Sequence, residues 1–135
     1  MFIENCALYE VQQGKHSDPG EDSMLIQIVD PGHEFPEPKF NFRFVNQYEF
    51  HDIESNKDGW VSFSEEQAKS IATNLQFAYD NNFNVIVHCM MGVCRSGAVV
   101  EVGTMLGFKD TGRWRQPNLY VKKLLMKHLN LLPYS

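Results

Sequence analysis

The sequence predicts a single α/β domain, spanning residues 1–135, with a central, mostly parallel, twisted sheet of four to five strands flanked by helices. One observation is the continuous β-branched run at residues 85–87, which is typical of a strand buried on both faces of a parallel sheet. A second observation is that apolar residues recur at helical spacing in the segments before and after this run. Strand, helix and parallel strand in alternation form the unit from which α/β layers are built.

The N-terminal third is expected to be rich in strands. Residues 2–11 mix apolar and polar side chains and predict a first, somewhat irregular strand, and residues 24–29 give a stronger strand signal. Asp30 then opens a turn, and three prolines preclude regular structure as far as Lys39. The aromatic alternation over residues 40–53 predicts one or two strands near a sheet edge.

The remaining elements are expected to be helices and the buried strand. Ser64 and Gln67 match a capping box, which starts a helix that ends near Asn81. A second helix begins at Arg95 or Ser96 and ends before Gly107. A third, with Pro117 in its first turn, has one apolar face formed by Val121, Leu124, Leu125, His128 and Leu132.

Composition narrows the possible functions. Of the 135 residues 43% are hydrophobic, the formal charge is −5, and the basic residues are loosely spaced, so a nucleic-acid surface is not expected. Because the sequence contains neither an apolar run near 18 residues nor a signal peptide, we expect no membrane span and a cytoplasmic location. Three cysteines without framework spacing fit a reducing compartment. Oligomeric state is not addressed by these patterns.

The segment between the buried strand and the second helix carries the strongest chemical signal. A loop of five residues separates Cys89 from Arg95, and so short a loop before a helix N-terminus turns its N–H groups inward to form a nest for an oxyanion. A cysteine in that position is favoured as a thiolate nucleophile. The planar guanidinium of Arg95 can bind two phosphoryl oxygens at once. The residues predicted to bind the phosphate are Met90, Met91, Gly92, Val93, Cys94 and Arg95.

Three neighbours have supporting roles in this prediction. Gly92 allows a positive φ or a close backbone approach. Ser96 can donate a hydrogen bond to the sulfur of Cys89, which makes that sulfur a better leaving group. His88 is better placed to hold the loop than to move protons. As the alternative, Cys89 is an ordinary buried thiol and Arg95 a surface charge.

The run from His88 to Ser96, His-Cys-Met-Met-Gly-Val-Cys-Arg-Ser, resembles the His-Cys-x-x-Gly-x-x-Arg-Ser/Thr signature of the cysteine-dependent protein tyrosine phosphatase superfamily, in its small dual-specificity-like branch. The segment ending in His51-Asp52-Ile53 and the pair Pro117-Asn118 also resemble small bacterial tyrosine phosphatases. The resemblance implies a phosphatase-like fold and a phosphocysteine intermediate. It departs from those relatives at Cys94, where they usually carry serine, and at His51.

When the bond between phosphorus and the leaving oxygen breaks, an acid must protonate the departing alcohol or phenol. The resemblance implies that this acid follows the strand before the capped helix, which favours Asp52; Asp58, on a Gly-containing loop, is the alternative. His51 can assist. No metal or cofactor is required, and a zinc site at His88, Cys89 and Cys94 lacks further ligands.

The predicted substrate is a phosphorylated protein or peptide carrying phosphotyrosine, with tolerance for phosphoserine and phosphothreonine. Phosphoinositides and RNA 5′-phosphates are alternatives, disfavoured because the loop has Met90, Met91 and Val93 where basic residues would be needed. Met90 and Met91 suggest an apolar rim that accepts an aromatic ring. The alternative from another functional class is a binding module that captures phosphorylated partners without hydrolysing them. A reversible disulfide between Cys94 and Cys89 is one interpretation. The favoured alternative is that Cys94 only occupies a position where a small side chain fits.

Overall fold

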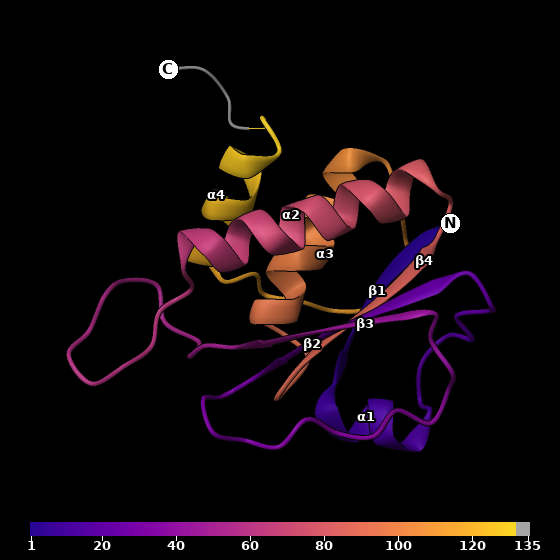
Figure 1. Ribbon diagram of the computed structural model, residues 1–135, viewed down its shortest axis with the longest axis horizontal. Helices are drawn as coiled ribbons and strands as arrows, with labels where there is room; N and C mark the ends of the chain where they lie inside the picture. The colour runs from indigo at the N-terminus through magenta and orange to yellow at the C-terminus, as the bar shows by residue number, and fades with distance from the viewer. Residues whose placement is uncertain (132–135) are drawn as a thin grey trace.

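The computed structural model describes residues 1–131 and contains one five-stranded, wholly parallel sheet with the strand order β3-β2-β4-β1-β5 (Figure 1). This confirms the predicted α/β class and strand number. The strands are β1 (Phe2–Ala7), β2 (Ser23–Val29), β3 (Phe44–Glu49), β4 (Asn84–Cys89) and β5 (Lys109–Asp110). The helices are α1 (Leu8–Gln13), α2 (Glu65–Asp80), α3 (Arg95–Leu106) and α4 (Leu119–His128).

Helices cover both faces of the sheet, but unequally. In Figure 1 helices α2, α3 and α4 lie together on one side, and α1 lies alone on the other. The larger core sits under the three helices and includes Phe50, Phe63 and Leu75, each at most 1% exposed. The smaller core, beneath α1, is built around Val11. A central strand covered on both faces must be apolar throughout, which explains the continuous run in β4.

The central position of β4 determines where the functional residues gather. It pairs with β1 on one side and with β2 on the other, in a register that sets Ala7 beside Cys89. Because every strand is parallel, the segments that leave their carboxyl ends all emerge at one edge of the sheet. Ligands of open α/β sheets bind at this edge.

Several predicted elements are confirmed. Strand β2 covers residues 24–29, and β4 covers 85–87. Ser64 caps α2: its hydroxyl accepts from the N–H of Gln67 at 3.0 Å while the Gln67 side chain accepts from the Ser64 N–H. Helix α3 begins at Arg95 and ends before Gly107.

The prediction of a strand over residues 2–11 is wrong beyond Ala7. The chain turns into helix α1 at Leu8 because the Glu10 carboxylate accepts a hydrogen bond from the Ala7 N–H at 2.9 Å. Gly14, at φ +70°, then ends the helix. The helix therefore stands directly beside the carboxyl end of β1.

The aromatic stretch over residues 40–53 forms one strand, β3, at the sheet edge, as predicted, with one buried side chain, Tyr48. One further expectation needs correction. Helix α4 begins after Asn118, whose side chain accepts from the Val121 N–H, so Pro117 precedes the cap instead of lying in the first turn. Leu132, expected on the apolar face of this helix, lies outside the described residues.

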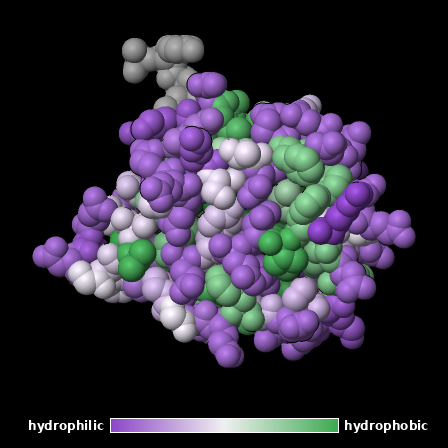
Figure 2. All heavy atoms as spheres, viewed as in Figure 1, coloured by the Kyte–Doolittle hydropathy of each residue, from purple (hydrophilic) through white to green (hydrophobic). Residues whose placement is uncertain are grey.

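The face of the molecule drawn in Figure 2 is mostly hydrophilic, with an apolar patch beside the C-terminal end of α2. Phe44 of β3 and Phe77 of α2, both about two-fifths exposed, pack edge to face with ring centroids 5.5 Å apart. No helix within residues 1–131 combines the length and the apolar character that crossing a membrane requires.

Candidate active site

The backbone of residues 89–95, hereafter the Cys89 loop, has its carbonyl groups turned outward. Four of them accept hydrogen bonds from other segments: Met90 O from Leu8 N (3.3 Å), Gly92 O from Asn5 Nδ2 (2.8 Å), Val93 O from Gln116 N (3.2 Å) and Cys94 O from Asn118 N (2.9 Å). In a planar trans peptide unit the N–H points opposite to the carbonyl. The N–H groups that follow these carbonyls therefore point inward, and those of residues 90–94 donate to no other group within residues 1–131. The loop is a nest suited to an anion.

Gly92 makes this curvature possible. Its φ is +76°, and a Cβ added there would lie 2.4 Å from both Ala7 N and the carbonyl carbon of Cys6. The predicted need for glycine is confirmed, and the close approach is to the backbone of β1. Strand β1 thus supports the Cys89 loop from behind.

Cys89 is the last residue of β4 and is 2% exposed. Its sulfur lies 3.1 Å from the hydroxyl oxygen of Ser96, which is fully buried in the first turn of α3. When Cys89 is a thiolate it can only accept, so Ser96 donates. The strand and the helix together bring the predicted nucleophile and its hydrogen-bond donor into contact.

Arg95 is 4% exposed and held by one terminal nitrogen. Its Nη1 donates to the Asp30 carboxylate and to the Phe50 carbonyl, both at 2.7 Å. Its Nε is buried and has no hydrogen-bond partner within residues 1–131. Leaving a buried donor unpaired costs about 1–3 kcal/mol, so this edge of the guanidinium is suited to an incoming acceptor.

His88 is fully buried, and its Nδ1 lies 3.3 Å from the Cys89 carbonyl oxygen. Burial lowers the pKa of His88 to about 4, and the positive charge of Arg95 acts in the same direction. The ring is therefore neutral at pH 7. This agrees with the prediction that His88 holds the loop and does not move protons.

Asp52, the predicted acid, follows β3 and lies beside the Cys89 loop. Its Oδ1 accepts a hydrogen bond from Asn118 Nδ2 at 2.7 Å. The buried Asn118 amide also donates to the Ile53 carbonyl at 3.1 Å, while its backbone N–H binds the Cys94 carbonyl. One residue therefore joins the Asp52 segment to the loop, next to a recess of about 460 Å³ that Asp52, Cys94 and Asn118 help to line.

Cys94 faces the same carboxylate. Burial raises the pKa of the Cys94 thiol above its ordinary value, and the negative charge of Asp52 raises it further. The thiol is thus protonated at neutral pH, and Cys6, Cys89 and Cys94 are all free. The disulfide between Cys89 and Cys94 stays a prediction.

The alternative acid, Asp58, is exposed in the long loop between β3 and α2 and does not line the recess. His51 closes the base of that loop: its Nδ1 accepts from the Val61 N–H at 2.9 Å, and its ring packs edge to face on Trp60. The structure therefore uses His51 to hold the loop that follows Asp52.

Sequence reasoning missed three residues that shape the site. The sequence pattern places Asp30 only in a turn, although it binds Arg95. The pattern places Asn5 only in a strand, and Asn118 enters only through the family resemblance. The sequence feature that could identify Asp30 is its position directly after residues 24–29, which strongly predict a strand. The sequence around Asn5 and Asn118 carries no comparable signal.

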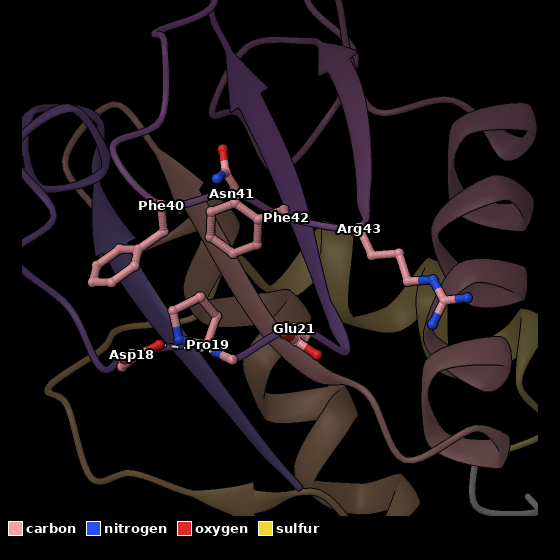
Figure 3. Close-up of a pocket in the computed structure, with 8 residues that line it drawn as sticks. Asp18, Pro19, Glu21, Phe40, Asn41, Phe42 and Arg43 are labelled. Atoms are coloured by element: carbon pink, nitrogen blue, oxygen red, sulfur yellow. Dashed lines mark hydrogen bonds between the residues drawn. The ribbon is translucent and has the colours of Figure 1, made fainter.

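A second cavity, of about 620 Å³, lies at the opposite edge of the sheet and does not belong to this site (Figure 3). The rings of Phe40 and Phe42 stand over Pro19, while Arg43 extends away from them. Within the described residues, no three His, Cys, Asp or Glu side chains are grouped to hold a metal ion, so His88, Cys89 and Cys94 do not form such a group.

No protein-family model matches the chain, and no curated protein matches it in sequence. Solved structures do match. The human tyrosine phosphatase-like serine/threonine/tyrosine-interacting protein is 16% identical with a TM-score of 0.60, covering 93% of this chain and 89% of its own. Human DUSP28 is 13% identical, with a TM-score of 0.56 and coverages of 95% and 91%. The Orf virus tyrosine phosphatase OH1 is 13% identical, with a TM-score of 0.51 and coverages of 93% and 81%. The chain therefore has the fold of the small dual-specificity-like members of the tyrosine phosphatase superfamily, as the resemblance implied.

Proposed function

We propose that the chain is a cysteine-dependent phosphatase that hydrolyses phosphate monoesters, phosphotyrosine above all, with tolerance for phosphoserine and phosphothreonine. The observation that carries the proposal is the geometry around Arg95: Asp30 and Phe50 hold one nitrogen, while the buried Nε has no partner within residues 1–131. This edge and the inward N–H groups of the Cys89 loop would bind the phosphoryl oxygens. The fold supports the same assignment.

In the first proposed step the Cys89 thiolate attacks phosphorus in line with the leaving oxygen. A sulfur–phosphorus bond forms as the phosphorus–oxygen bond breaks, and Asp52 gives its proton to the departing oxygen. The N–H groups of the loop and Arg95 stabilise the charge of the transferring phosphoryl group. The products are the dephosphorylated substrate and a phosphocysteine.

In the second step water hydrolyses the phosphocysteine. Asp52, now ionised, accepts a proton from the water, whose oxygen bonds to phosphorus while the sulfur leaves as a thiolate. Ser96, 3.1 Å from that sulfur, stabilises the thiolate by donating its hydroxyl proton into a hydrogen bond. Neither step calls for a metal or a cofactor.

The proposed partner is a phosphorylated protein or peptide. Two features support it over a polyanionic ligand: the chain carries a formal charge of −5, and the side chains of Met90, Met91 and Val93 at the loop are uncharged. Phosphoinositides and RNA 5′-phosphates remain the alternatives. The free thiols are compatible with the cytoplasmic location, which stays a prediction.

Hydrolysis of p-nitrophenyl phosphate tests the proposal. We expect turnover by the unmodified chain, none by Cys89→Ser, and retention of phosphate binding by that variant. Arg95→Lys is the matched variant for the guanidinium, because it keeps the charge but loses the planar fork. Turnover that survives Cys89→Ser would refute the mechanism.

A pair of substitutions tests the acid. We expect Asp52→Asn, which preserves the shape of the side chain, to lower kcat by about 10²–10⁴ for aryl phosphates with poor leaving groups and by less for p-nitrophenyl phosphate. Asp58→Asn, in the exposed loop, should leave kcat unchanged. The reverse pattern would assign the acid to Asp58.

A phosphate-binding module without turnover is the second candidate function. One specific observation favours it, since a solved structure with the same fold is described as a phosphatase-like interacting protein. The intact set of Cys89, Arg95 and Ser96 favours the enzyme. Phosphopeptide binding with no measurable hydrolysis by the unmodified chain would support the module.

A further inference from the structure

Three large apolar side chains stand exposed on segments that meet at one side of the Cys89 loop. Tyr9 is 53% exposed, Met91 79% and Trp114 72%. Tyr9 lies in the first turn of α1, Met91 in the loop itself and Trp114 in the segment between β5 and α4. We call these three side chains the apolar platform. Large exposed apolar side chains on adjoining segments commonly mark an interaction site.

Backbone contacts bring these segments together although they are far apart in sequence. The buried Asn5 amide donates to two carbonyls at once, Gly92 O at 2.8 Å and Trp114 O at 3.1 Å. The Leu8 N–H, one residue before Tyr9, donates to Met90 O at 3.3 Å. The residues that carry the platform are therefore each adjacent in the chain to a backbone group that holds the loop.

A salt bridge fixes α1 against the segment of Trp114. Arg113 Nη1 donates to both carboxylate oxygens of Glu10 at 3.0 Å, and Arg113 Nη2 donates to the Lys15 carbonyl at 2.7 Å. Because Glu10 follows Tyr9 and Arg113 precedes Trp114, this pair holds the two aromatic residues on neighbouring segments. The platform is thus built on fixed backbone.

Both arginines on the segments that carry the platform are paired with carboxylates. Arg113 is paired with two glutamates, and Arg115 is paired with Glu101 and Asp110. Within residues 5–10, 90–94 and 111–116 these are the only two Lys or Arg side chains. A ligand with several phosphates needs further free cations, whereas apolar side chains gain by contact with exposed rings and a thioether.

We propose that the apolar platform binds uncharged, apolar side chains that flank the phosphorylated residue, so that the substrate is a singly phosphorylated peptide segment with apolar neighbours. The proposal rests on the proposed function, because the phosphate must occupy the Cys89 loop for the platform to contact its neighbours. Tyr9 and Trp114 are then specificity-determining residues that do not touch the reacting atoms.

The test uses two phosphotyrosine peptides that differ only at the positions on either side of the phosphotyrosine, Leu and Phe in one and Glu in the other. Their Kd values are measured by fluorescence anisotropy on the full chain carrying Cys89→Ser, so that the measurement does not depend on turnover. Tyr9→Gln and Trp114→Gln are compared in that background. Met105→Gln, 47% exposed at the far end of α3, is the matched control.

We expect the apolar peptide to bind about tenfold more tightly than the acidic one, and each platform variant to weaken it about fivefold, as loss of part of an aromatic contact predicts. Affinity for the acidic peptide and for inorganic phosphate should change less than twofold, and Met105→Gln should change nothing. Equal affinity for both peptides, or equal losses for both in the variants, would overturn the proposal. So would tighter binding of an inositol polyphosphate or a 5′-phosphorylated RNA than of either peptide.

Hydrolysis of p-nitrophenyl phosphate is measured for the unmodified chain, Tyr9→Gln and Trp114→Gln. It distinguishes failure of the platform from failure of the proposed phosphatase function. This small ester has no side chains flanking its phosphorylated ring, so equal kcat/KM values in all three proteins are expected. Loss of peptide discrimination with normal hydrolysis would refute the platform alone. Discrimination in binding with no hydrolysis would refute the enzyme and leave the platform supported.

Discussion

Substitution of Gly92 by alanine tests whether the backbone shape of the Cys89 loop is what makes the site. The added Cβ would lie 2.4 Å from Ala7 N and from the carbonyl carbon of Cys6, whereas ordinary contact begins at 3.4 Å. Both neighbours are backbone atoms of β1 at residues where it is paired with β4, so they resist displacement and the loop must move by about 1 Å. A displacement of that size at reacting groups lowers rates about 100-fold.

A second cost accompanies the displacement. Alanine at φ +76° loses about 1–2 kcal/mol of stability through backbone strain. In a domain of this size each kcal/mol lowers Tm by roughly 3–5 °C. Two quantities are therefore measured: kcat for p-nitrophenyl phosphate, and Tm by circular dichroism. We expect a folded variant with a modestly lowered Tm and about 1% of the activity.

Gly20→Ala separates strain from displacement. Gly20 has nearly the same φ, +74°, but no atom lies within 4 Å of a Cβ built there, and it lies at the opposite edge of the sheet. This variant should lose similar stability and keep its activity. A Gly92→Ala protein with kcat within about threefold of the unmodified chain, or an equal loss of activity in Gly20→Ala, would refute the reasoning.

Three further predictions concern charged and titrating groups. Asp30→Ala removes the carboxylate that orients the loop guanidinium, so kcat should fall about tenfold with little change in Tm, and an unchanged kcat would contradict that role. Burial lowers the pKa of His88 to about 4, whereas an unfolded histidine titrates at about 6.5. Between these two pH values the folded state therefore binds fewer protons than the unfolded state. The free energy of unfolding should fall by up to about 3 kcal/mol as pH decreases through this window. Urea midpoints as a function of pH should show this slope, and His88→Asn should reduce it. In the Cys89→Ser background, alkylation of Cys94 should accelerate only at a higher pH than for an ordinary thiol, because burial and the Asp52 charge raise the pKa of Cys94. In Asp52→Asn the acceleration should come at a lower pH. Identical profiles would mean that the two side chains are not in contact.

The sequence predicted those parts of the fold whose signal is local. The apolar run of β4, the capping box at Ser64 and the helical spacing that follows it each depend on neighbours a few residues away, and each was found. Helix α1 was missed for the same reason. It has six residues and a single buried side chain, Val11, so it has no periodic pattern, and its start depends on one side-chain contact of Glu10.

The candidate site likewise divides into residues with a local sequence signal and residues whose contacts are distant in sequence. The Cys89 loop could be predicted because the nucleophile, the glycine and the arginine lie within seven residues. Asp30 could not, because its contact with Arg95 spans 65 positions and exists only because β2 lies next to β4 in the sheet. Asn5 likewise acts on Gly92 from 87 positions away.

The place of β1 between β4 and β5 has a consequence for how the protein is made. On the ribosome β1 is synthesised well before either neighbour, and its partner β4 is completed only at residue 89. Until then the nascent chain must carry this strand with both edges unpaired, a state in which chaperones bind and neighbouring chains aggregate. Because most pairings are distant in sequence, folding should be slow, and the anion nest should form late, after nearly all of the chain has left the exit tunnel.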